Sequence, residues 1–192
     1  MKVMTILGSP RKNGNTAKAL GWVEEHLRSK GHHVVRVNIA DCDLKGCREC
    51  YTCQEPHDEL NCPTDDDAKA VFEQMIASDI VVFASPLFCW DFPAQMKPLI
   101  DRHFCLATGF GTPQHRSLIE GKRVALLVTA GGPVEDNADL IVEVFNRVSA
   151  FTRTRIVARL VVPLCTTPGE MGESVRRMAC DFACGIVEGS KA

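Results

Sequence analysis

The chain has 192 residues, of which 45% are hydrophobic and 24% charged, and its formal net charge is −2. This length predicts one domain, spanning residues 1–192, with a well-buried core. The weakly acidic balance argues against nucleic acid as the main partner. No apolar run approaches membrane-spanning length and no targeting signal precedes the first predicted strand, so we expect a cytoplasmic protein that does not bind a membrane.

The first seven residues form a short apolar run, which predicts a buried parallel strand. A polar loop follows it, Gly8-Ser9-Pro10-Arg11-Lys12-Asn13-Gly14-Asn15-Thr16. A helix is predicted from residue 16 to residue 30, and a glycine at position 31 ends it. The free N–H groups and the positive dipole end of that helix would point into the loop, which favours a bound anion. We therefore predict a phosphate-binding loop, and the alternative is an ordinary capped turn.

The spacing of the loop narrows the type of phosphate ligand. A P-loop has four residues between its glycines and then Gly-Lys-Ser/Thr, whereas five residues separate Gly8 from Gly14, and Asn15 replaces the lysine. The dinucleotide fingerprint G-x-G-x-x-G is also missing. Gly109-Phe110-Gly111 comes nearest to it, but follows no apolar strand and lacks the third glycine. A single terminal phosphate, as in flavin mononucleotide (FMN), fits the loop better.

Strand and helix patterns alternate along the rest of the chain, which is typical of a parallel sheet. Further strands are predicted at 34–38, 80–84, 124–128 and 156–162, and further helices at 65–78, 93–104, 136–150 and 170–187. A polar, cysteine-rich insertion occupies about 41–64, and the loop from 104 to 120 is long enough to be functional. The predicted fold class is α/β, a doubly wound five-stranded parallel sheet with strand order 2-1-3-4-5.

In such a sheet the ligand lies outside the carboxyl ends of the strands, where strands one and three diverge. Three loops meet there, at 8–15, 85–92 and 129–137. The second loop carries a leucine and three aromatic residues that could wall an apolar ring system, although they could also merely pack the following helix. The third loop begins Thr129-Ala130-Gly131-Gly132-Pro133 and offers small residues and open backbone amides to the polar edge of a ring.

These loops supply one predicted FMN site with three parts. The phosphate would be held by Ser9, Arg11, Asn13, Gly14, Asn15 and Thr16; the isoalloxazine ring would be flanked by Pro86, Leu87, Phe88 and Trp90; its polar rim would meet Thr129, Ala130, Gly131 and Gly132. No side chain is predicted to act as a nucleophile or acid, because the flavin carries the chemistry.

The chain contains ten cysteines, which is unusual for a protein of a reducing compartment unless some of them bind metal. One group has the spacing Cys47-x2-Cys50-x2-Cys53-x8-Cys62. Other cysteines stand among apolar neighbours and are predicted to fill the core, namely Cys89, Cys105, Cys165, Cys180 and Cys184. The acidic run Asp65-Asp66-Asp67 is interpreted as a charge cluster at a helix N-terminus rather than a metal site.

Three segments together resemble the NAD(P)H-dependent FMN reductase group of flavodoxin-like proteins. They are the loop from Gly8 to Thr16, the segment Ser85-Pro86-Leu87-Phe88-Cys89-Trp90 followed by Lys97 and Asp101-Arg102, and the segment Thr129-Ala130-Gly131-Gly132. The cysteine spacing is similar to that of iron–sulfur flavoproteins, a branch with a compact cysteine motif before the third strand. The resemblance implies an FMN cofactor, NAD(P)H as a co-substrate, and a homodimer or homotetramer with the flavin ring at a subunit boundary.

Four thiolates at short spacing suit a [4Fe–4S] cluster, because soft sulfur ligands on a loop can reach four corners of a cube. Cys47, Cys50, Cys53 and Cys62 are the predicted ligands, although the last gap slightly exceeds what the branch leads us to expect. A zinc knuckle made by Cys50, Cys53, His57 and Cys62 is the competing interpretation, and a metal-free segment is the third.

The sequence thus predicts an FMN-dependent oxidoreductase. With a cluster, it would couple a one-electron donor such as ferredoxin to a small two-electron acceptor; without one, NAD(P)H would reduce the flavin directly. A non-enzymatic carrier of the flavodoxin type is the second hypothesis, against which the small net charge of −2 argues, because flavodoxins usually present a strongly acidic surface. A zinc-stabilised domain without flavin is the third.

Overall fold

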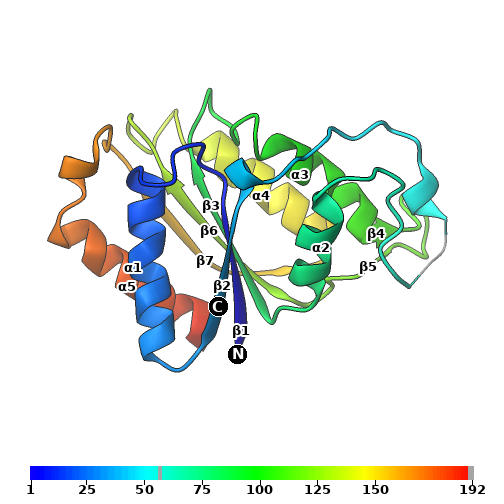
Figure 1. Ribbon diagram of the computed structural model, residues 1–192, viewed down its shortest axis with the longest axis horizontal. Helices are drawn as coiled ribbons and strands as arrows, with labels where there is room; N and C mark the ends of the chain where they lie inside the picture. The colour runs from blue at the N-terminus through cyan, green and yellow to red at the C-terminus, as the bar shows by residue number, and fades with distance from the viewer. Residues whose placement is uncertain (56–57, 190–192) are drawn as a thin grey trace.

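The computed structural model describes residues 1–55 and 58–189. Its centre is a five-stranded parallel sheet in the order β2-β1-β3-β6-β7 (Figure 1). The strands are β1 (Lys2–Leu7), β2 (His33–Asn38), β3 (Ile80–Pro86), β6 (Arg123–Thr129) and β7 (Arg155–Val162). Because β4 and β5 are short and lie outside this sheet, the order confirms the predicted doubly wound topology.

Helices cover both faces of the sheet (Figure 1). Helices α1 (Asn15–Ser29) and α5 (Glu173–Glu188) pack on one face, while α2 (Ala68–Ile76), α3 (Lys97–Asp101) and α4 (Asp139–Phe151) cover the other. Successive residues of a strand point to opposite faces, and β1 follows this rule: Met4 and Ile6 enter the core under α2 and α4, whereas Val3 and Leu7 enter the core under α1 and α5. The central strands are buried on both faces, as their continuous apolar runs predict.

Shorter elements complete the chain. They are the 3₁₀ helices η1 (Ile39–Asp41), η2 (Thr52–Gln54), η3 (Arg102–Leu106) and η4 (Pro168–Glu170), and the antiparallel strands β4 (Ala107–Thr108) and β5 (Arg116–Ser117). None of the helices in the described part of the chain is long and apolar enough to cross a membrane.

The predicted helix at 93–104 is wrong in its extent. Regular α-helix is confined to the five residues of α3, and the 3₁₀ helix η3 continues from it. Pro98 lies in the first turn of α3, the part of a helix in which a fixed φ and a missing N–H are tolerated. A helix that began at residue 93 would place Pro98 in its interior, so the helix begins later than predicted. The predicted loop from 104 to 120 also contains the β4–β5 pair, which the sequence analysis missed because strands of two residues have no detectable alternation.

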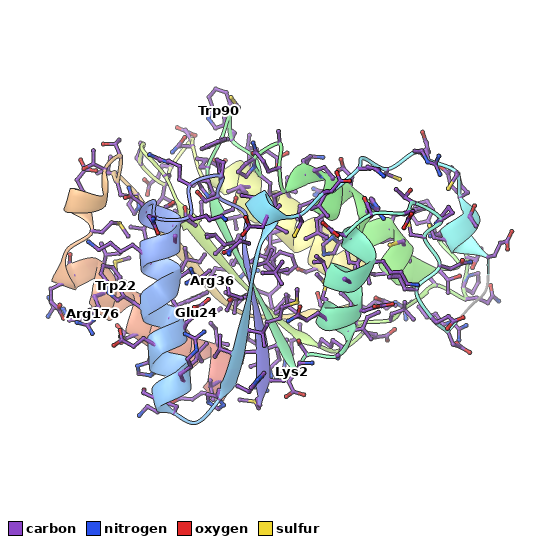
Figure 2. The ribbon with its side chains drawn as sticks, in the orientation of Figure 1. Lys2, Trp22, Glu24, Arg36, Trp90 and Arg176 are labelled. Carbon is purple, nitrogen blue, oxygen red and sulfur yellow. The ribbon has the colours of Figure 1, made fainter. Side chains whose placement is uncertain are left out.

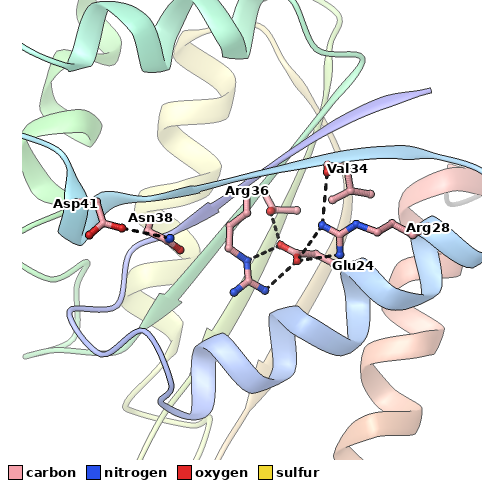
Figure 3. A network of polar contacts seen from close by, with 7 residues as sticks. Glu24, Arg28, Val34, Arg36, Asn38 and Asp41 are labelled. Atoms are coloured by element: carbon pink, nitrogen blue, oxygen red, sulfur yellow. Dashed lines mark hydrogen bonds and ion pairs between the residues drawn. The ribbon is translucent and has the colours of Figure 1, made fainter.

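A buried carboxylate joins α1 to the first two strands (Figure 3). Glu24 is 3% exposed; it accepts a hydrogen bond of 2.5 Å from the hydroxyl of Thr5, and Arg36 donates to both carboxylate oxygens at 2.8 and 2.9 Å. Arg28 approaches the same carboxylate at 3.4 Å. This network fixes the edge strand β2 and helix α1 relative to β1, whose carboxyl end leads into the loop from Gly8 to Thr16.

Candidate functional site

A pocket of about 240 Å³ opens at the carboxyl ends of β1, β3 and β6. Nine of the predicted FMN contacts line it, namely Ser9, Arg11, Asn15, Thr16, Pro86, Leu87, Phe88, Thr129 and Gly131. The three loops chosen from the sequence therefore converge in space, at the switch point where β1 and β3 diverge.

The polar end of the pocket is the N-terminus of α1. Gly14 precedes the helix in an extended conformation, and no side chain caps the helix. No acidic residue stands in the first turn either, so the helix itself carries no negative charge that would neutralise its positive dipole end. Upstream, the hydroxyl of Ser9 donates to the carbonyl oxygen of Arg11 at 3.2 Å and accepts from the N–H of Arg11 at 3.1 Å, which folds the loop back toward the helix. The arrangement is suited to binding an anion.

Two buried side chains of α1 tie this loop to the far side of the pocket. The hydroxyl groups of Thr16 and Thr129 are 2.7 Å apart, which links α1 to the end of β6. The amide nitrogen of Asn15 donates to the carbonyl oxygen of Cys165 at 2.8 Å, which links α1 to the segment after β7. Asn15 is 5% exposed, and its Oδ1 has no hydrogen-bond partner among the described residues. A ligand with hydroxyl groups would satisfy this acceptor.

Cys165 and Thr166 also line the pocket, and sequence reasoning missed both. They follow β7, whose carboxyl end lies at the same edge of the sheet as the three chosen loops. Their position after a predicted parallel strand could have identified them, because the loop that follows each parallel strand lies at that edge of the sheet.

Five predicted contacts do not line the pocket, namely Asn13, Gly14, Trp90, Ala130 and Gly132. Trp90 lies at the tip of the turn in which Phe88 and Asp91 exchange backbone hydrogen bonds of 3.1 and 3.0 Å, and its side chain is 53% exposed at the end of that loop (Figure 2). The N–H of Ala130 donates to the carbonyl oxygen of Val162 at 2.9 Å, so it extends the sheet. The roles of these five residues stay predictions.

A second cavity, of about 230 Å³, lies between the cysteine-rich segment and η3. It is lined by all four cysteines of the motif, Cys47, Cys50, Cys53 and Cys62, and also by Cys105, Arg102, Tyr51 and Phe104. Figure 1 shows the segment on the side of α2 and α3, away from α1. Within the described residues no three histidine, cysteine or acidic side chains are arranged to hold a single metal ion. His57, which the zinc interpretation requires, lies outside the described residues.

Hydrogen bonds anchor the cysteine-rich segment near its start and in its middle. Near its start, the backbone N–H groups of Asp43 and Lys45 donate to the carboxylates of Asp67 and Asp66 at 2.7 and 2.8 Å. In η2, the amide nitrogen of Gln54 donates to the carbonyl oxygens of Phe104 and Ala107, each at 3.0 Å. The acidic run before α2 was expected to be a charge cluster at the helix N-terminus. Its carboxylates also hold the start of the cysteine-rich segment by accepting backbone hydrogen bonds.

The environments of the sulfur atoms differ. The pKa of the Cys50 thiol is lowered because the hydroxyl and backbone of Thr52 donate hydrogen bonds to its sulfur. Burial raises the pKa of the Cys53 thiol, and raises that of the Cys105 thiol further. The sulfur of Cys62 accepts a hydrogen bond from the guanidinium of Arg102 at 3.3 Å.

The expectation that the scattered cysteines fill the core is partly wrong. Cys89 is exposed, because it lies in the turn beside Trp90 with a positive φ of 46°. Cys105 and Cys165 do belong to the core, as expected, and each also lines one of the two cavities. Arg102 belongs to a segment that resembles a flavin-ring helix, yet it lies at the cysteine cavity.

A family model for NADPH-dependent FMN reductases matches residues 1–170. The chain belongs to the NADPH-dependent FMN reductase family. This match confirms the resemblance seen in the sequence, and with it the expected class of enzyme, an FMN-dependent oxidoreductase.

Two relatives are named iron-sulfur flavoproteins. The protein from Methanosarcina thermophila is 35% identical over 106 residues, which are 55% of this chain and 54% of that protein. The protein from Archaeoglobus fulgidus is 30% identical over 194 residues, covering 98% of this chain and 80% of that protein. The chain therefore spans about half the length of the first relative and four fifths of the second.

Among solved structures, the NAD(P)H:quinone oxidoreductase from Methanothermobacter marburgensis superposes with a TM-score of 0.69 at 20% identity, over 97% of this chain and 96% of that one. This likeness shows a shared fold.

FMN is the cofactor that the reductase family implies, and the first pocket fits it. An uncapped helix N-terminus suits the phosphate, and the unpartnered Oδ1 of Asn15 suits a hydroxyl of the ribityl chain. Leu87 and Phe88 provide apolar surface for the ring. The second cavity matches an iron–sulfur cluster only in the chemistry of its possible ligands, because the four cysteines of the motif are among the residues that line it.

Proposed function

We propose that this FMN reductase takes electrons from NAD(P)H or from a one-electron donor such as ferredoxin and delivers them to a small acceptor, with a quinone as the first candidate. One observation carries the proposal: loops from β1, β3 and β6 converge on a single pocket that has the uncapped N-terminus of α1 at one end and apolar side chains at the other. The NAD(P)H:quinone oxidoreductase from Methanothermobacter marburgensis, which has the same fold, supports NAD(P)H and a quinone as the reactants to test first.

In this proposal the residues of the chain bind and orient FMN, while bound FMN supplies the electron-transfer chemistry. Arg11 and the first N–H groups of α1 would neutralise the phosphate charge. Leu87 and Phe88 would exclude water from one face of the ring, and Thr129 and Gly131 would present backbone groups to its polar rim. Ser9, Asn13, Gly14, Asn15, Thr16, Pro86, Trp90, Ala130 and Gly132 complete the proposed set.

We further propose that Cys47, Cys50, Cys53 and Cys62 hold a [4Fe–4S] cluster. The names of the two relatives support this, and so does the cavity that all four cysteines line. The cluster would transfer single electrons, which is the reason to name ferredoxin as a partner. A homodimer or homotetramer and a cytoplasmic location stay predictions.

One preparation tests the main points. The protein is purified without oxygen, and its visible spectrum, iron and sulfide content and turnover of NAD(P)H with a quinone are measured. We expect flavin bands, about four irons per chain as a [4Fe–4S] cluster requires, and turnover. Flavin without iron would remove the cluster from the proposal, zinc in its place would favour the knuckle, and bound flavin without turnover would favour an electron carrier.

A variant pair tests the phosphate loop. Arg11→Gln should weaken FMN binding about tenfold or more, because it removes a charge from the pocket lining. The matched control is Lys12→Gln, which removes an equal charge from the next position, where the ammonium pairs with Asp41 instead of lining the pocket. Equal FMN affinities of the two variants, measured by flavin fluorescence, would contradict the proposed role of Arg11.

A further inference from the structure

The Arg102 side chain is the most deeply buried cation in the described part of the chain. It lies at the start of η3 with 2% of its surface exposed, and it lines the cysteine cavity. One guanidinium nitrogen, Nη1, donates to Asp66 at 2.5 Å and to the carbonyl oxygen of Lys45 at 3.3 Å. The other, Nη2, donates to the sulfur of Cys62 at 3.3 Å. The Nε atom is buried without a partner among the described residues.

A structural ion pair with Asp66 does not account for this arrangement. Asp66 already accepts backbone hydrogen bonds from Lys45 at 2.8 Å and Ala68 at 3.1 Å, so its carboxylate is well supplied with donors. Burying an arginine is costly, and an apolar side chain of similar size often replaces a buried pair without loss of stability. The feature that a purely structural role leaves unexplained is that Nη2 meets a sulfur atom of the cysteine motif.

A guanidinium beside sulfur has a definite chemical effect. Arginine keeps its charge at every pH at which a protein is folded, and a neutral thiol is a weak acceptor. The contact places a hydrogen-bond donor and a positive charge against the Cys62 sulfur, at a half-buried position where charge interactions are stronger than in water. Hydrogen bonds to the sulfur ligands and nearby charge are two of the factors that set the reduction potential of an iron–sulfur cluster.

We infer that Arg102 is a positioning residue for Cys62, whose sulfur it holds by a hydrogen bond, and that its charge raises the reduction potential of the cluster. The inference rests on the proposed function, because it requires a cluster bound by Cys62. One-electron reduction adds negative charge to the cluster, and a buried cation stabilises that charge. The role is specific to Arg102, since Asp66 and Lys45 hold it in place without touching the sulfur.

The test replaces the pair rather than the arginine alone, because Arg102→Met would leave the Asp66 carboxylate buried and unpaired. The double variant Arg102→Met with Asp66→Asn removes both charges and keeps similar volumes. The matched control is Arg36→Met with Glu24→Gln, which removes a buried ion pair on the α1 side of the sheet, away from the cysteine segment (Figure 2). Arg102→Lys keeps the charge but loses the fork that reaches both Asp66 and Cys62.

Three quantities are measured on anaerobically purified protein: iron and sulfide content, the loss of iron to a chelator, and the midpoint potential of the cluster from a redox titration followed by electron paramagnetic resonance. For the Arg102 and Asp66 double variant we expect iron loss about tenfold faster, as for other partners of metal ligands. We also expect a lower midpoint potential, by about 59 mV for each tenfold change in the one-electron equilibrium. Arg102→Lys should fall between this variant and the wild type.

The outcomes separate the inference from the proposed function. Wild-type protein without iron and sulfide would overturn the cluster and the inference together. Wild-type protein with a cluster, and a double variant with unchanged iron loss and potential, would overturn the inference alone. If the control with Arg36→Met shows the same changes as the Arg102 variant, the effect is general destabilisation and the inference is wrong.

Discussion

Replacement of His103 by leucine should remove a large part of the sensitivity of this fold to acid. His103 is 3% exposed in η3, and its ring packs against Phe72 and Phe83 with centroids 5.7 Å apart in each pair. Its Nδ1 lies 2.8 Å from the carbonyl oxygen of Leu99 and donates to it, so the neutral ring leaves Nε2 as an acceptor, buried without a partner among the described residues. Burial lowers the pKa of His103 from 6.5 to about 4.

The sign of the effect follows from linkage. Below pH 6.5 the unfolded chain binds a proton at this histidine, whereas the folded chain stays neutral until the pH approaches 4. The free energy of unfolding is therefore not reduced by this histidine above pH 6.5, and it falls as the pH drops from 6.5 toward 4. A difference of 2.5 pKa units, from 6.5 to about 4, corresponds to about 3 kcal/mol at 1.36 kcal/mol per unit.

The assay is urea unfolding of flavin-free, reduced protein at several pH values between 7 and 4. The free energy of unfolding of the wild type should fall by about 3 kcal/mol more than that of His103→Leu over this range. His33→Leu, at an exposed position on β2, controls for the loss of a histidine as such. Parallel pH profiles for the wild type and His103→Leu would refute the assignment of the lowered pKa to burial of this ring.

Three other substitutions test features of the fold and the pocket. Glu24→Ala should lower the free energy of unfolding by about 3 kcal/mol, because it leaves the Arg36 guanidinium without its carboxylate partner. Adding Arg36→Met should restore part of this loss, as measured by chemical denaturation. Gly8→Ala should cost about 1–3 kcal/mol, since the new Cβ would lie 2.2 Å from the sulfur of Met96; a melting temperature equal to that of the wild type would show that the loop moves freely. Thr129→Val should weaken FMN binding in a fluorescence titration, by severing the 2.7 Å contact with Thr16, and unchanged affinity would show that the contact does not shape the pocket.

Much of the fold and of the first pocket could be predicted from local patterns. Apolar runs such as 80–84 identify buried strands without long-range information, and parallel strands bring their following loops to one edge of the sheet. This is why nine of the predicted contacts share a pocket. Trp90 does not line it, because the path of the loop depends on a tight turn with positive φ at Cys89 and Trp90, which no composition rule predicts at non-glycine residues.

The second cavity could be predicted only in part. The spacing of its four cysteines marks them as one group, but Arg102 and Cys105 line the same cavity although they follow Cys62 by 40 or more positions in the chain. Nothing in the sequence around Cys105 separates it from a core cysteine, since it is buried and has apolar neighbours. Its place depends on how η3 turns after α3, and that turn is a tertiary effect.

The two contacts that α1 makes across the first pocket have a consequence for how a ligand is received. Thr16 and Asn15 belong to the first turn of α1, yet their side chains are hydrogen-bonded to the end of β6 and to the segment after β7 on the other side of the pocket. The N-terminus of α1 and the far side of the pocket are thus joined into one frame by hydrogen bonds, and are not separate loops. A ligand that fits this frame loses little free energy to ordering the protein, so most of its contact energy remains available for affinity.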